Sequence, residues 1–174
     1  DNTPPTIAIT ATDGSNAVAD GATTNDNTLT VTFTSSEATS NFAASDITVS
    51  GGAISNFSAT SSTVYTATFT PSAAAPTTID VAANKFTDGV GNNNTAANQF
   101  NWNYDGTSPT VSLVSSTSPD GTYGVRDTIA ITIIFSETVT VTGIPQLELN
   151  LDSLVSNTTN LQRINYESGT GGTT

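Results

Sequence analysis

The chain has 174 residues and a mass of 17.7 kDa, which is room for one sandwich domain of about 100 residues and part of a second. Three cationic residues stand against fifteen carboxylates, so the formal net charge is -12. A chain this acidic cannot neutralise a row of phosphates, which excludes nucleic acid as a partner. No run of about eighteen apolar residues occurs, so we expect no membrane insertion.

The absence of His and Cys limits the kinds of catalytic and metal-binding sites that the chain can form. It excludes Ser-His and Cys-His nucleophiles, imidazole or thiolate zinc sites, and disulfides. The strong ligands that remain are oxygen atoms, which suit calcium best. A glycosidase could work with two carboxylates alone, but the sequence indicates no cleft and no cationic partner for them. We therefore expect no catalytic activity.

Strands with alternating apolar residues follow one another from the start of the chain. The clearest runs from Thr28 to Thr34, where Leu29, Val31 and Phe33 share one face. Six more are expected around residues 7–9, 47–49, 54–57, 64–69, 79–82 and 100–104, separated by turn residues at 12–16, 51–52, 71–76 and 88–92. Seven short strands with this spacing predict an all-β fold, an immunoglobulin-like antiparallel sandwich.

An internal repeat defines the domain organisation. The opening segment 1–7, DNTPPTI, recurs at 105–111 as DGTSPTV. A second match aligns Glu37 and the strand before it with Glu137 and the strand before it. Two tandem copies of one unit are therefore predicted, with a first domain at 1–104 and a second at 105–174.

The second copy is predicted to be incomplete. It contains about four strand patterns, and Leu147, Leu149 and Leu151 lie on one face of one of them. A half-sandwich cannot bury such a face by itself. We expect either the parent chain or a neighbouring copy of the same repeat or subunit to supply the missing strands, so that 1–104 alone would be a monomer and 1–174 would aggregate or form fibres.

Several segments resemble the bacterial Ig-like repeats of large secreted adhesins and other cell-surface proteins. They are the opening D-x-T-x-P, the strand end Phe33 to Glu37, the segment Asp46 to Gly52, and KFTDGVGN at 85–92. The second copy resembles a sister repeat through Asp120 to Tyr123 and Phe135 to Val139. Ser35 departs from the pattern, because such repeats carry a core phenylalanine there. The resemblance implies an extracellular or cell-surface location.

Carboxylates supply the candidate site. In an Ig-like sandwich the loops after the second and sixth strands lie at the end where the chain enters, which would gather Asp1, Glu37 and Asp88. By the repeat, Asp105 and Glu137 would meet at the entry of the second domain. The acidic loops at the opposite end of the first domain hold Asp13, Asp20 and Asp26. The similar repeats bind calcium at such junctions, which implies a structural calcium ion here.

Simpler structural roles are alternatives to ligand binding for several of these residues. An Asp in a Gly-Asn loop commonly serves turn geometry, and the segment beginning at Asp13 lacks the Glu that an EF-hand loop needs. Trp102 could stack a sugar ring, but its alternation with Phe100 and Tyr104 favours packing in the core.

The sequence thus predicts a non-catalytic structural module of an exported stalk, fibre, adhesin or surface layer, stiffened by calcium. The alternative is a binding module of a secreted protein that presents loops or an exposed strand to a surface glycan or a host protein. The number of D-x-T-x-P copies in the parent chain discriminates between the two, because many copies favour a stalk.

Overall fold

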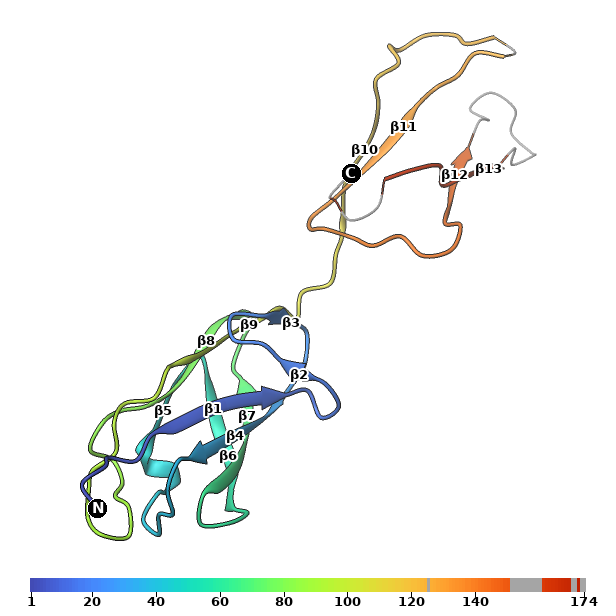
Figure 1. The fold of residues 1–174 in the computed structure, drawn as a ribbon. Coiled ribbons are helices and arrows are strands. Elements are labelled where there is room, and N and C mark those ends of the chain that lie inside the picture. The colour runs from blue at the N-terminus through green and yellow to red at the C-terminus, as the bar shows by residue number, and fades with distance from the viewer. Residues whose placement is uncertain (125, 151–160, 170–171, 173–174) are drawn as a thin grey trace. The chain divides into compact units, whose positions relative to one another are not determined.

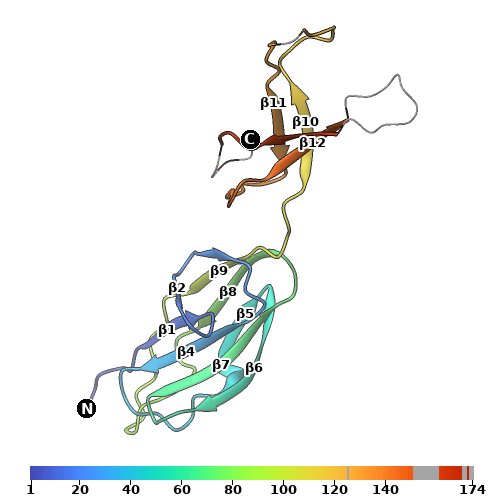
Figure 2. The same ribbon diagram turned by 90° about the vertical axis from the view of Figure 1, so that its right-hand side faces the viewer.

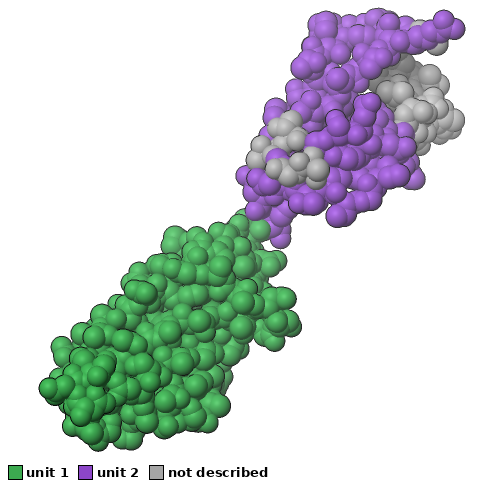
Figure 3. All heavy atoms as spheres, viewed as in Figure 1, with its two compact units in different colours: residues 1–107 green, residues 108–174 purple. Residues whose placement is uncertain are grey.

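The chain forms two units, residues 1–107 and residues 108–174 (Figure 3). The computed structural model describes residues 1–124, 126–150, 161–169 and 172. Asp105, where the sequence repeat begins, lies near the end of the first unit. Its amide donates a 2.9 Å hydrogen bond to the carbonyl of Thr24.

The first unit is a sandwich of two sheets (Figures 1 and 2). One sheet has the strand order β2-β1-β4-β7-β6 and the other β3-β9-β8-β5. The first comprises β1 (Ile7–Thr12), β2 (Ala17–Val18), β4 (Leu29–Ser35), β6 (Gly52–Ala59) and β7 (Val64–Pro71), and the second β3 (Thr23–Thr24), β5 (Ile47–Ser50), β8 (Ala75–Val81) and β9 (Phe100–Tyr104). A single 3-10 turn, η1 (Ala44–Asp46), precedes β5. The predicted all-β sandwich is confirmed.

The core lies between the two sheets and follows the alternation of the strands. On β4, Leu29, Val31 and Phe33 are fully buried, while the threonines between them face outward. Trp102 of β9 contributes the largest fully buried side chain, with 1% of its surface exposed. Removing this apolar surface from water is the main favourable contribution to folding. The predicted packing of Trp102 in the core is therefore correct.

A group of aromatic rings fills one part of the core. Phe42 lies in the loop after β4, and its ring contacts four others at centroid distances of 5.1–5.6 Å, those of Phe33, Phe57, Tyr65 and Phe86. Three of these contacts have the edge-on geometry that aromatic quadrupoles favour. Phe42 belongs to no strand, yet it packs against three residues of the first sheet and against Phe86, which follows β8 of the second sheet.

The expected turn at Pro71–Pro76 is shorter in the structure. β7 extends to Pro71, and β8 begins at Ala75 with Pro76 as its second residue. β5 pairs only with residues 78–81 of β8, so at Pro76 the strand has a neighbour on one side only. Sheets accept proline at such edges because no ladder hydrogen bond is lost there.

The described part of the second unit has two sheets of two strands each. They pair β10 (Val111–Ser116) with β11 (Ile131–Phe135), and β12 (Gln146–Asn150) with β13 (Leu161–Asn165). Among the residues of the second unit whose burial is described, none is buried as a whole, and Leu113 and Val114 are each half exposed. Leu151, expected on the face of Leu147 and Leu149, lies outside the described residues. A sandwich core comparable to that of the first unit is thus missing from the described part of the second unit.

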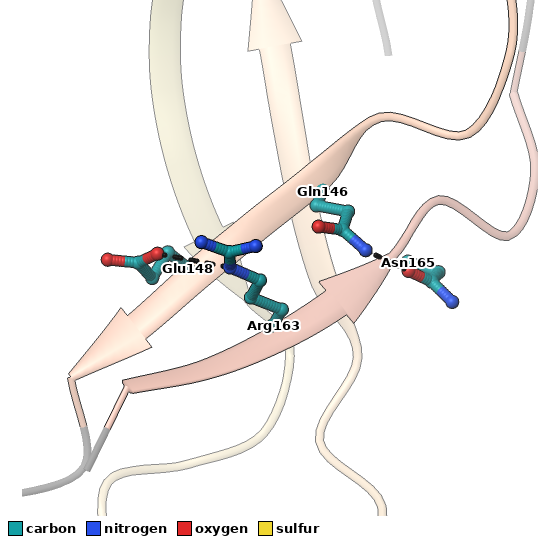
Figure 4. A network of polar contacts seen from close by, with 4 residues as sticks. All are labelled: Gln146, Glu148, Arg163 and Asn165. Carbon is teal, nitrogen blue, oxygen red and sulfur yellow. Dashed lines mark hydrogen bonds and ion pairs between the residues drawn. The ribbon is translucent and has the colours of Figure 1, made fainter.

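The β12–β13 pair has one polar face (Figure 4). Gln146 Nε2 donates to Asn165 Oδ1 at 2.9 Å, and Arg163 Nε lies 3.4 Å from Glu148 Oε2. Each pair joins residues directly opposite in the ladder. The ion pair is exposed, so it contributes at most about 1 kcal/mol. Among the described residues, no helix is both long and apolar enough to cross a membrane.

Candidate metal centre

Three carboxylates from distant parts of the sequence meet at one end of the first unit. Asp1 precedes β1, Glu37 follows β4, and Asp88 lies in the loop that leads towards β9. One carboxylate oxygen from each lies within 4.8 Å of the others. These three, which we call the acidic cluster, are the residues expected to converge at the end where the chain enters. Their role as metal ligands stays a prediction.

The loop at 88–92 fixes the Asp88 carboxylate. Asp88 Oδ1 accepts hydrogen bonds from the amides of Val90, Gly91 and Asn92 at 2.7–2.9 Å. Burial raises the pKa of the Asp88 carboxyl, but these bonds and one from the Asn92 side chain outweigh burial, so the pKa lies below its ordinary value. Asp88 is therefore a carboxylate at neutral pH although its residue is only 7% exposed.

The Asn92 side chain also contacts the acidic cluster. Its Nδ2 donates to Asp88 Oδ2 at 2.7 Å and to the Asp1 carbonyl at 3.5 Å. The sequence analysis did not predict this contact of the Asn92 side-chain amide. The available signal was an asparagine four residues after an aspartate in a glycine-rich loop.

Local hydrogen bonds also set the positions of the other two carboxylates. Asp1 Oδ1 accepts from the Thr3 amide at 2.9 Å. Ser36, the residue before Glu37, exchanges two hydrogen bonds with Thr6, one through its hydroxyl and one through its amide, both 2.9 Å. The entry segment is thus tied to the end of β4 beside Glu37.

No basic side chain in the described part of the chain forms an ion pair with the acidic cluster. The ion pair found among the described residues joins Arg163 and Glu148 in the second unit. Clustered carboxylates repel one another unless a cation or protons neutralise them. Carboxylate oxygens with nearby carbonyls are the donor set that calcium prefers, so the residues present fit a calcium ion.

Two of the other candidate ligands, Asp13 and Asp26, do not join a cluster of three acidic residues within the described chain. Asp13 forms its own turn, because its carboxylate accepts from the Ser15 and Asn16 amides and from the Asn16 side chain. Hydrogen bonds from the Asn16 amide first, and then from Ser15, lower the pKa of Asp13. Asp26 is half-buried, and its amide lies 3.5 Å from Thr24 Oγ1.

Asp105 and Glu137 belong to different units, so their convergence stays a prediction. The same local bonds nonetheless occur at both repeat starts. Thr107 donates to Asp105 Oδ1 at 3.0 Å, and Thr110 donates to Ser136 Oγ at 3.0 Å. Glu137 Oε1 is a buried atom without a hydrogen-bond partner among the described residues.

Trp102, considered above as a sugar platform, is inaccessible. Its indole N–H donates to Thr24 Oγ1 at 3.0 Å, and its ring packs against Phe69 and Tyr104. A stacking platform needs an exposed ring face, so Trp102 does not provide one.

Comparison with known proteins identifies a family. The family model described as bacterial Ig-like domain matches residues 1–104. No curated protein matches the chain, and no solved structure matches it either.

Proposed function

The chain belongs to the bacterial Ig-like domain family, and from this we propose that it is a structural module of an exported cell-surface stalk, fibre, adhesin or surface layer. Domains of this family are typically non-catalytic and are often found in surface proteins. The complete sandwich of the first unit supports a structural role, and the lack of His and Cys excludes His-activated nucleophiles and zinc sites built from imidazole or thiolate. The extracellular location and the surface role are parts of the proposal.

We further propose that the acidic cluster binds one structural calcium ion. The observation that carries this proposal is the convergence of Asp1, Glu37 and Asp88 without a basic partner among the described residues. Asp88 Oδ1 already accepts three amide bonds, whereas Oδ2 accepts one bond, from the Asn92 side chain, so Oδ2 is the atom with a lone pair left for a cation. Calcium would remove the repulsion among the carboxylates and hold the entry segment to the loops at 37 and 88.

Thermal unfolding of the chain with calcium and with excess chelator tests the calcium site. An ion that binds only the folded state stabilises it by about 2.7 kcal/mol when its concentration is one hundred times its dissociation constant. We expect a higher midpoint in calcium, and magnesium should have a smaller effect because it demands tighter octahedral geometry.

Glu37→Gln is the informative variant, because the Glu37 carboxylate takes no part in the 88–92 loop. It should fold normally and lose most of the response to calcium. Asp80→Asn, on β8 and outside the acidic cluster, should keep the full response. An equal response in both variants would reject the assignment of Glu37, and no response in the unaltered chain would reject the calcium site.

The surface role is tested separately. An antibody raised against the first unit should label intact cells that produce the parent protein, without permeabilisation. Labelling only after permeabilisation would reject the proposed location while leaving the calcium result unaffected.

A further inference from the structure

We draw no further inference here: the strongest candidate, the exposed apolar face of strands β10 and β11 in the second unit, carries nothing because no feature of the described residues shows what covers it.

Discussion

The indole N–H of Trp102 donates a 3.0 Å hydrogen bond to the hydroxyl of Thr24. Thr24 lies on β3, a strand of two residues that pairs parallel to β9, the strand that carries Trp102. The side-chain bond therefore supports a pairing that has only two positions in its ladder. It also satisfies the one polar atom of the largest buried side chain.

Thr24→Val is expected to destabilise the first unit by about 1–3 kcal/mol, the cost of leaving a buried donor unpaired. Valine keeps the branched shape of threonine, so the loss reports the hydrogen bond rather than packing. Thr24→Ser retains the hydroxyl and should recover most of the stability. Urea unfolding monitored by Trp102 fluorescence measures both, and equal destabilisation in the two variants would contradict the role of the bond.

Asn94 is buried and makes four hydrogen bonds to the main chain. Its Oδ1 accepts from the Lys85 and Phe86 amides, and its Nδ2 donates to the Ala82 and Thr95 carbonyls. Asn94→Ala should therefore lower the free energy of unfolding by about 3 kcal/mol, because several buried main-chain groups lose their partners. Thermal or urea unfolding of the variant measures the loss.

Asn94→Asp tests the two Nδ2 bonds separately from the shape of the side chain. The aspartate has the same shape, but it places an oxygen against the two carbonyls that the amide now faces, so it should destabilise at least as much as alanine. Asn98→Ala is the matched control, since Asn98 is exposed and should change stability by less than about 0.5 kcal/mol. A stable Asn94→Asp variant would show that the Nδ2 bonds contribute little.

The strands of the first unit could be predicted from the sequence because alternation marks a sheet with one buried face. The burial of Phe42 could not be predicted, because Phe42 lies in a loop whose sequence has no periodic pattern. β2 and β3 were missed for a related reason, since each has only two residues. Contacts made by loops and by two-residue strands depend on the tertiary fold, so the local sequence does not predict them.

The acidic cluster was predictable for a different reason. Its three residues follow from the topology of a sandwich, in which the loops at one end are shared by strands far apart in sequence. The spacing of Asn92 from Asp88 was a signal for the amide contact, but the spacing alone does not specify how the 88–92 loop folds around Asp88. Topology thus predicts which loops meet, whereas side-chain partners within a loop require the structure.

The lowered pKa of the Asp20 carboxyl allows a prediction of how the stability of the first unit depends on pH. Hydrogen bonds to Asp20 from the amide of Asn101, and then from its side chain, lower the pKa of the Asp20 carboxyl. A carboxyl whose pKa is lower in the folded state stabilises the fold at pH values above its unfolded pKa, which is about 3.9 for Asp. This contribution is lost as the pH falls through the folded-state pKa. The first unit should therefore weaken in acid below about pH 4.

Asp20→Asn isolates that contribution, because the amide oxygen can still accept both bonds while the charge is absent. The stability difference between the unaltered chain and this variant should be larger at about pH 6 than at about pH 2, measured by urea unfolding. Asp13→Asn should show the same sign, since the pKa of Asp13 is also lowered. A difference that does not change with pH would contradict the prediction for either residue.

The first unit should be stable without the rest of the chain, because its core is formed by its own two sheets. We expect a fragment of residues 1–107 to unfold cooperatively with a midpoint close to that of the full chain. The full chain should self-associate more than the fragment, since β10 exposes Val111, Leu113 and Val114. Calorimetry and sedimentation velocity measure the two properties, and a monodisperse full chain with two cooperative transitions would contradict this expectation.

Leu29 and Ile129 are equivalent positions of the repeat, yet Leu29 is fully buried and Ile129 is 42% exposed. Leu29→Ala should cost about 2–5 kcal/mol, because it leaves a cavity in a packed core. Ile129→Ala should cost less than about 1 kcal/mol, because the side chain is already largely in water. Urea unfolding of both variants in the full chain measures the contrast. Similar losses at the two positions would mean that in solution the second unit buries Ile129 in a core of its own, completed by strands beyond the four described.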